Sequence, residues 1–485
     1  MRYLMRKHLA IACTLLFGLY ACEDSEDTFN PLNPDLSIEA VVGTVQSTTR
    51  TLNGAERQLS LLMNEIVPLT EIASDNYVNT QTFYNQFVDD LTIDIADTDI
   101  NDIQFDIARL RELTTTGIDI IVPADEGATD TDIAGLYFLR GMAYVYAGSL
   151  FNALPGEPGG PAIPAENHLD LALQNFTQAI NIAPDSEYGA AARVARARTY
   201  YHLGDREGAV DDAQIAIQAT PSQLYVARYD PNSGVGPTNT MQDAIYDRGS
   251  FDDLQPLPTL DFLDPKYNGS DATVDISIPV VKIEEAHLIL AEAALSQDDL
   301  EGAKSIMKDI ISLVATRPTQ TFPDGAEGRP QVNPGSRPDS AIVAVAPGPD
   351  RDFEEGLVIN RQSGPVTVPI VSGTSFTEDE IDDLVDVNEA YEALYRMRQE
   401  IFVAEGRRAT DIGITFVISD RELIANPNVS EADNDFTLVP SWLASLGGGI
   451  DEFTYDAAAG RATITHNVNR LTIENRDSDL VVPFE

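Results

Sequence analysis

A stretch of polar and aromatic residues near position 80 has the chemistry of a ligand-binding surface. Aromatic faces stack on sugar rings or on apolar ligand groups, and Asn and Asp side chains form directional hydrogen bonds. A capped, well-packed loop would use the same residue types, so both interpretations stay open. The candidate ligand-binding residues are the only tryptophan, Trp442, and five residues of this stretch: Asp75, Asn76, Tyr77, Asn79 and Tyr84.

A second group of charged residues lies near position 408. Glu405, Arg408 and Asp411 have the i,i+3 spacing at which ion pairs form at a helix end. Gly406 would allow the backbone to approach a neighbouring element closely. A catalytic carboxylate pair is the alternative. Because 78 of the 485 residues are acidic, carboxylate pairs occur often by chance, and we interpret this segment as structural.

The sequence lacks the short motifs that typically mark catalytic or metal sites. Its five histidines are scattered, and the HExxH, GxSxG, P-loop and GxGxxG patterns are absent. The two cysteines are Cys13 and Cys22, so the chain beyond position 22 has none for an internal disulfide, a zinc site or a nucleophile. We therefore expect no enzyme activity, no metal site and no cofactor.

The charge balance limits the partners. The sequence has 31 Lys and Arg against 78 Asp and Glu, which gives a formal net charge of −47. Nucleic acid is an improbable partner because phosphate binding needs basic patches. Anionic membrane surfaces are disfavoured for the same reason. The hydrophobic content of 43% is enough to build a substantial core.

The N-terminus has the features of a bacterial lipoprotein. Three basic residues precede an apolar run over residues 9–19, which is too short for a stable membrane-spanning helix. Leu19-Tyr20-Ala21-Cys22 resembles a lipobox, and lipid attached to Cys22 would anchor the chain without a spanning segment. We expect a signal peptide over residues 1–21 and an acidic tether over 22–35. The membrane contact would be through the lipid alone.

Internal repeats predict pairs of helices in the middle of the chain. The clearest pair spans 188–203 and 206–219, with Gly204 at the turn, and it resembles a tetratricopeptide repeat. Such pairs bury their apolar faces by stacking on one another. Further helices are expected over 133–150, 168–184, 284–314 and 386–404. A stripe of small residues on the second helix of the clearest pair would let it pack closely: Ala209, Ala213 and Ala216.

The remaining segments are less regular. Proline, glycine and β-branched residues predict long loops with minor strand content, including a small hairpin over 357–371. The expected fold is mostly α, with tetratricopeptide-like repeats, long irregular loops and minor β. We expect one domain, which comprises a repeat scaffold and three loop-rich regions. The domain covers 36–485, its scaffold about 133–221, 282–316 and 386–412, and its loop-rich regions about 223–281, 317–385 and 416–485.

Several motifs, in this order, resemble the SusD/RagB family of outer-membrane nutrient-binding lipoproteins. The lipobox is followed at once by the acidic run 23–27. Residues 134–144 resemble the family's helix that ends in a Phe…Pro turn. The sequence EAHLILAEA at 285–293 and the sequence RQEIFVAEGRRATDI at 398–412 resemble two further family elements. The chain departs from the family in its C-terminal tail and in having one Trp where polysaccharide-binding members usually have several.

The resemblance implies a role at the cell surface. Such proteins are SusD-like lids on a TonB-dependent, SusC-like transporter in the outer membrane, where they capture a nutrient such as an oligosaccharide and pass it on. It also implies that the segment around Asp75 contributes to the binding surface. Two other functions stay open, namely a tetratricopeptide scaffold that assembles proteins at the cell surface and a glycan hydrolase.

Overall fold

A computed structural model gives the fold of most of the chain. The signal segment and the tether, with Cys22, lie outside the described residues. Within the part that is described, no helix combines the length and the apolar character needed to cross a bilayer. The structure describes residues 42–44, 46–79, 85–230, 236–247, 254–268, 275–323, 342–478 and 481–484.

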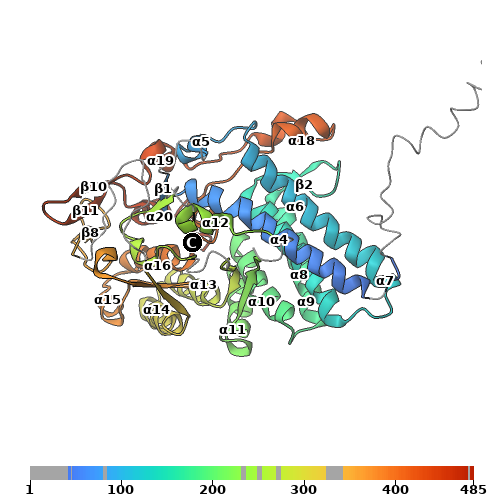
Figure 1. Ribbon diagram of the computed structural model, residues 1–485, viewed down its shortest axis with the longest axis horizontal. Coiled ribbons are helices and arrows are strands. Elements are labelled where there is room, and N and C mark those ends of the chain that lie inside the picture. The colour runs from blue at the N-terminus through green and yellow to red at the C-terminus, as the bar shows by residue number, and fades with distance from the viewer. Residues whose placement is uncertain are drawn as a thin grey trace, which may run out of the picture.

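Three long helices form one layer of the molecule. The helices α4 (Ser47–Ile72), α6 (Thr98–Thr116) and α8 (Asp130–Leu150) pack against one another, and α4 and α6 run diagonally across Figure 1. Asp97 caps α6 by accepting hydrogen bonds from the backbone N–H groups of Asp99 and Ile100. The short helix α5 (Gln86–Asp89) precedes α6.

Antiparallel helix pairs continue from this layer. The helix α8 packs on α9 (Ala165–Ile182), α9 on α10 (Glu187–His202) and α10 on α11 (Arg206–Ala219). The predicted pair at 188–219 is therefore confirmed to within a residue, because the Gly204 turn and the Asp205 cap mark its boundary locally. The small residues predicted at the close contact are fully buried: Ala209, Ala213 and Ala216.

A second set of helices extends the scaffold. The helix α11 contacts α13 (Glu284–Leu295), which pairs with α14 (Leu300–Val314) and also packs on α16 (Val387–Phe402). The short helix α20 (Val468–Glu474) also packs on α16. The mostly α, tetratricopeptide-like fold class predicted from the sequence is confirmed.

The strands are short and lie in small, separate sheets. Four two-stranded antiparallel pairs and one three-stranded sheet occur in the described residues, and β8, β11 and β10 lie at the left end of Figure 1. The antiparallel pairs are β1 (Tyr77–Asn79) with β5 (Leu254–Pro256), β2 (Ala153–Pro155) with β3 (Ala162–Pro164), β4 (Leu224–Ala227) with β6 (Ile278–Lys282) and β7 (Thr319–Phe322) with β9 (Val366–Pro369). The three-stranded sheet has the order β10 (Phe453–Asp456), β11 (Arg461–Ile464) and β8 (Ala344–Ala346).

The hairpin predicted over 357–371 is wrong. Its second half forms β9, but β9 pairs with β7, which lies about 45 residues earlier in the chain. The first half contains a short 3-10 helix, Arg361–Ser363, instead of a strand. Arg361 is fully buried, and its guanidinium forms an ion pair with Asp261, 2.8 Å away. This buried long-range contact fixes the segment in place, and the local sequence pattern does not reveal it.

The core consists of two main apolar clusters. The larger is built mainly from α4, α6, α8, α9, α10, α11 and one side of α13, and the smaller mainly from the other side of α13, α14 and α16. The last described residues close the junction, because Val481 and Val482 belong to the smaller cluster and Phe484 to the larger. The ring of Phe484 packs edge-on against Tyr201, with 5.1 Å between centroids.

Candidate functional site

A row of hydrogen-bonded amides forms the floor of a small cavity beside α16. Gln399 donates from Nε2 to Asp75 Oδ2 at 3.1 Å and to Asn76 Oδ1 at 3.0 Å. Asn469 donates from Nδ2 to Gln399 Oε1 at 2.8 Å. Asp75, Gln399 and Asn469 line the cavity, and each of them is more than nine-tenths buried. The row joins three segments that are far apart in the sequence.

An ion pair holds the start of this row. Arg408 donates from Nε to Asp75 Oδ1 at 2.6 Å and from Nη2 to Asp75 Oδ2 at 2.9 Å. Both side chains are buried, so this bidentate ion pair fixes the carboxylate in one orientation. Asp75 lies in the turn between α4 and β1, and Arg408 follows α16. The ion pair therefore sets the position of the turn relative to α16.

One face of α16 supplies the wall of the cavity. Glu392, Arg396, Gln399 and Glu400 have the i, i+4, i+7, i+8 spacing that places them on one side of a helix. Arg396 donates to Glu354 Oε1 at 2.8 Å, and its Nε lies 3.3 Å from Glu400 Oε1. Both ends of the guanidinium are therefore engaged with carboxylates.

Burial also changes the acidity of this wall. Burial raises the pKa of Glu400 above its ordinary value, although Arg396 and the donors of Ser375 oppose that shift. Glu400 accepts hydrogen bonds from the Ser375 hydroxyl at 2.5 Å and from the Thr374 hydroxyl at 2.8 Å. These hydrogen bonds fix the orientation of the Glu400 carboxylate, which in turn positions the guanidinium of Arg396.

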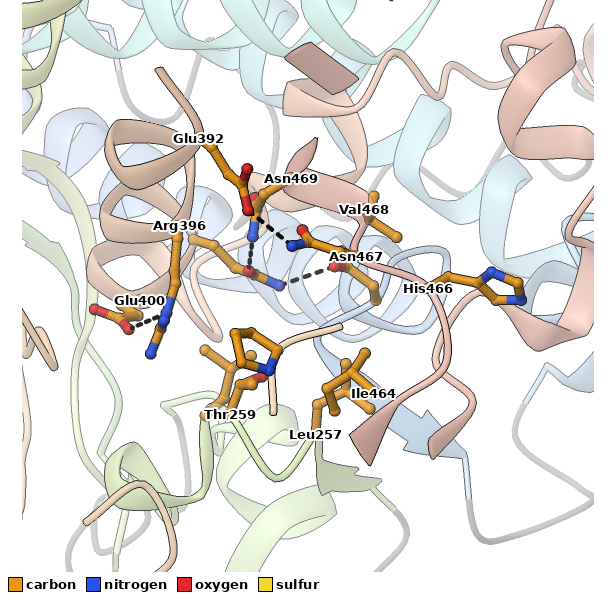
Figure 2. Close-up of a pocket in the computed structure, with 14 residues that line it drawn as sticks. Leu257, Thr259, Glu392, Arg396, Glu400, Ile464, His466, Asn467, Val468 and Asn469 are labelled. Carbon is orange, nitrogen blue, oxygen red and sulfur yellow. Dashed lines mark hydrogen bonds and ion pairs between the residues drawn. The ribbon is translucent and has the colours of Figure 1, made fainter. Parts of the chain in front are cut away.

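The rim is half-buried and polar. Asn467 caps α20 by accepting from the backbone N–H of Arg470 at 3.0 Å, and its Nδ2 donates to Glu392 Oε1 at 2.8 Å. Figure 2 shows Asn467 and Glu392 pointing toward each other, and His466 pointing away from the amides. Thr259, which also lines the cavity, is half-buried. The polar groups of the rim come from α16, from the start of α20 and from the segment after β5.

Apolar side chains fill the space between the polar groups. Leu257, Leu260, Ile464 and Val468 line the cavity and are buried. Its free volume is ≈ 40 Å³. Among the described residues no Phe, Tyr or Trp lines it, and the imidazole of His466 points away from the amides (Figure 2). The cavity can thus surround a small polar group, and it offers that group hydrogen bonds without the broad ring face of a Phe, Tyr or Trp.

The structure brings some predicted ligand residues to this cavity and keeps others apart. Asp75 lines it, and Asn76 shares the Gln399 donor but lies fully buried behind it, where its Nδ2 donates to Glu71 Oε2 at 2.6 Å. Tyr77 is 1% exposed and belongs to the core. Asn79 lies half-buried at the end of β1, opposite Leu254.

Two further candidates are not part of the cavity lining. Tyr84 lies outside the described residues. Trp442 is partly buried between the two apolar clusters, and it does not line the cavity. The ligand-binding role of all six candidates stays a prediction.

The charged segment predicted as structural is buried, but its ion pairs differ from the prediction. Mutual pairing of Glu405, Arg408 and Asp411 is wrong. Glu405 Oε1 accepts from the ammonium groups of two buried lysines, Lys266 at 2.5 Å and Lys282 at 2.6 Å. Asp411 pairs with Arg398 at 2.8 Å, and Arg408 pairs with Asp75 as described above. Each partner is an opposite charge because all three groups are buried, and only an opposite charge compensates the cost of burial.

Gly406 makes the close approach that the sequence predicts. Its φ angle is +73°, and a Cβ at this position would lie 2.9 Å from Ile66 Cγ2 on α4. The backbone N–H of Gly406 donates to Glu71 Oε1 at 3.0 Å. Burial raises the pKa of Glu71 to about 7. The glycine therefore lets the turn after α16 pack directly on the end of α4, beside Asp75.

Sequence reasoning missed the main polar residues of the cavity. Gln399 lies inside the family-like segment 398–412 but was not singled out there, and Asn469 and His466 lie in no motif. The polar residues at 392, 396, 399 and 400 share one face of α16, while the apolar residues of the helix pack on the core. A polar face on a helix that is buried all round indicates a polar site, so this pattern could have predicted the cavity. The partners of that stripe could not be found, because they lie about 70 and 320 residues away.

Metal ligation has no support in the described residues. No group of three or more His, Cys, Asp or Glu side chains there is arranged to hold a metal ion. The carboxylates of the cavity are held by arginines or by hydroxyl and amide donors. The arrangement is therefore suited to non-covalent binding of a small polar group.

Comparisons identify the fold. No protein-family model matches the sequence, and a comparison with curated proteins finds no match. Solved structures do match, and the fold they share with this chain is that of the SusD superfamily. The SusD-like fold predicted from the sequence motifs is therefore confirmed.

Three solved structures show the extent of the likeness. A SusD superfamily protein from Bacteroides fragilis has 14% identity and a TM-score of 0.54, with 80% of this chain and 99% of that one covered. Another SusD superfamily protein, from Parabacteroides distasonis, has 12% identity and a TM-score of 0.53, with 79% and 98% covered. A candidate sugar-binding protein from Bacteroides vulgatus has 15% identity and a TM-score of 0.51, with 79% and 97% covered.

Proposed function

We propose that this protein captures an oligosaccharide at the cell surface and passes it to a TonB-dependent, SusC-like transporter in the outer membrane. The observation that carries the proposal is the SusD-superfamily fold, which extends over four-fifths of the chain and nearly all of the solved relative. The sugar-binding assignment of the Bacteroides vulgatus neighbour supports a carbohydrate as the ligand. The lipid on Cys22 would hold the protein at the outer surface of that membrane.

The cavity beside α16 supports this kind of binding. Its buried amides offer directional hydrogen bonds, and its apolar walls, such as Leu257 and Val468, suit the C–H groups of a sugar. Its carboxylates are held by fixed donors and are not free to exchange protons with a substrate. The mechanism is therefore reversible binding followed by release to the transporter, with no covalent step.

Binding is tested with the full mature chain. Neutral oligosaccharides on a glycan array identify a ligand, and calorimetry measures its Kd. We expect His466→Ala to raise the Kd for that ligand by about tenfold, since His466 lines the rim of the cavity. The matched control is His287→Ala, which removes a half-buried histidine from α13, away from the cavity. Equal effects of the two substitutions, or no binding to any glycan, would count against the proposal.

The transporter is tested by purifying the lipoprotein from gently solubilised outer membranes. A TonB-dependent barrel in a ratio near one to one supports the hand-over. A preparation that contains only soluble surface proteins would instead favour a scaffold that assembles proteins. Turnover of an array-positive glycan, measured in the same preparation, would favour a hydrolase.

A further inference from the structure

A second and larger cavity lies between α6, the strand β2 with the loop after it, and the short helix α18 (Asp420–Ala425), near the top of Figure 1. We call it the α6 groove. Its volume is ≈ 770 Å³. Ligand sites in proteins have volumes of roughly 300–1,000 Å³, so the groove has the size of such a site. It shares no lining residue with the cavity beside α16.

Hydrogen bonds between distant segments hold the walls of the α6 groove together. Arg111 on α6 donates from Nη1 to the backbone carbonyl of Pro155 in β2 at 2.6 Å. Gln104 on α6 donates from Nε2 to the backbone carbonyl of Val417, which lies just before α18, at 2.8 Å. Both donors are buried. The groove is therefore formed before a ligand arrives, which lowers the entropic cost of binding.

Phe105 provides an accessible aromatic ring in this groove. Its side chain lines the groove, and the residue is 61% exposed. The buried side chains of Ile107 and Leu154 also line the groove and give it an apolar floor. An exposed ring above an apolar floor is the kind of platform on which the C–H face of a sugar stacks. The cavity beside α16 has no such platform.

Charged groups of both signs accompany the ring. Four carboxylates and three guanidinium groups line the groove, so their charges nearly cancel. Arg109 is exposed, and Arg421 is 62% exposed. The carboxylate that pairs with Arg421 is that of Asp102, whose Oδ1 lies 3.9 Å away, which is too far for a hydrogen bond. These guanidinium and carboxylate groups can donate to and accept from the hydroxyl groups of a sugar.

The same charges argue against other occupants. A lipid chain or an apolar protein helix would remove the charged groups from water without offering them hydrogen bonds, which is costly. An anionic ligand gains little, because carboxylates outnumber guanidinium groups in the groove and the whole sequence has a formal net charge of −47. A neutral sugar has an apolar C–H face for the ring of Phe105 and hydroxyl groups for the charged side chains.

We propose that the α6 groove is a second carbohydrate site, in which one ring of a neutral oligosaccharide stacks on Phe105 and its hydroxyl groups form hydrogen bonds with Arg109 and Arg421. This inference rests on the proposed function, because it adds a site for the same class of ligand. The protein thus holds carbohydrate at two places that are built from different residues.

The site is tested by photo-crosslinking on the full mature chain. The probe is a neutral oligosaccharide that binds on a glycan array and carries a diazirine at its reducing end, and mass spectrometry identifies the labelled peptides. We expect label on the groove segments 101–112 and 419–425. Label only on 464–469, at the cavity beside α16, would overturn the second site and leave the proposed function standing. If no neutral oligosaccharide binds, both are overturned.

Substitutions of the ring show whether it holds the sugar. Phe105→Ala should reduce the groove label at least tenfold, and Phe105→Tyr, which keeps a ring, should retain it. The matched control is Phe87→Ala, because Phe87 is 62% exposed, lies on α5 and does not line the groove. Arg421→Ala should reduce the same label, and it covers the case in which Phe105→Ala does not fold.

Two results with these variants would overturn the second site. One is a groove label of equal strength in Phe105→Ala and in the parent chain, because the ring would then not hold the sugar. The other is the loss of a co-purifying protein from Phe105→Ala while its oligosaccharide label stays unchanged, because the groove would then be a protein interface.

Discussion

At the scale of single residues, several buried charges of this molecule are paired with opposite charges. Glu285 lies between Arg198 at 2.6 Å and Arg407 at 2.7 Å, and all three side chains are buried. Burial by itself raises the pKa of Glu285, but the two arginines outweigh burial and hold the pKa well below its ordinary value. Such groups contribute more to the position of the elements than to net stability, because desolvation offsets much of their attraction.

The Asp75–Arg408 pair gives a direct test of this view. Arg408→Met keeps the length of the side chain and leaves Asp75 buried without its partner, which costs about 3–5 kcal/mol in comparable cases. We expect a loss of this size in the free energy of unfolding, measured in urea. The control is Arg421→Met, because Arg421 is 62% exposed and lies 3.9 Å from Asp102. That exposed pair should contribute at most about 1 kcal/mol. Similar losses in the two variants would contradict the expectation.

Glu292 should make stability depend on pH. Burial raises its pKa to about 7 from an ordinary value of 4.5, so the folded chain binds this proton more tightly than the unfolded chain. Its contribution to stability is therefore complete below about pH 4.5 and is lost as the pH rises through about 7. The glutamine of Glu292→Gln does not titrate. It can still accept a hydrogen bond from the Tyr201 hydroxyl, which in the parent chain lies 2.7 Å from Glu292 Oε2.

The variant Glu292→Gln should thus gain stability relative to the parent chain between pH 5 and pH 8. The gain is at most about 3 kcal/mol, the equivalent of a shift from 4.5 to about 7. It is measured as the difference in unfolding free energy at each pH. Glu301→Gln, at a side chain that is 84% exposed, serves as the control. A difference that stays constant with pH would show that Glu292 is ionised in the folded chain.

At the scale of elements, the turn after α16 must fit against α4. Gly406 and Gly159 both have positive φ angles, +73° and +65°, so alanine strains the backbone similarly at the two positions. A Cβ at Gly159 meets nothing within 4 Å, whereas one at Gly406 lies 2.9 Å from Ile66 Cγ2. We expect Gly159→Ala to lower the free energy of unfolding by about 1–2 kcal/mol, because of backbone strain alone. Gly406→Ala should lower it by about 1–3 kcal/mol more, because the added Cβ also overpacks the contact with α4. Equal losses on thermal unfolding would mean that α4 can move away.

The elements also show what the sequence can predict and what it cannot. The pair 188–203 and 206–219 was predictable, because its turn, its cap and its small-residue stripe all lie within about 35 residues. The pairing of β9 with β7 and the partners of Gln399 were not predictable, because contacts across about 45 to 320 residues leave no local pattern. Asp75 was singled out by its residue type and by the family resemblance of its segment, and its partner Arg408 was found separately as part of a motif.

At the scale of the whole molecule, the excess of acidic residues should control stability. With a formal net charge of −47, the folded chain repels itself more strongly than the expanded one, and salt screens this repulsion. We expect the melting temperature to rise by several degrees between 10 mM and 0.5 M NaCl, as measured by calorimetry. An uncharged osmolyte at the same osmolality is the control for effects that do not involve charge. A melting temperature that falls with salt would indicate that attractive ion pairs dominate.

The long reach of the Asp75–Arg408 contact constrains when the molecule can finish folding. Arg408 follows Asp75 by 333 residues. At about 5–20 residues per second, synthesis of that interval takes on the order of 20–70 s. Throughout this time Asp75 lacks its arginine partner, and Oε1 of Glu71 lacks the backbone N–H of Gly406. A chain that ends before position 408 can form its repeat helices, but it cannot close its core at the end of α4.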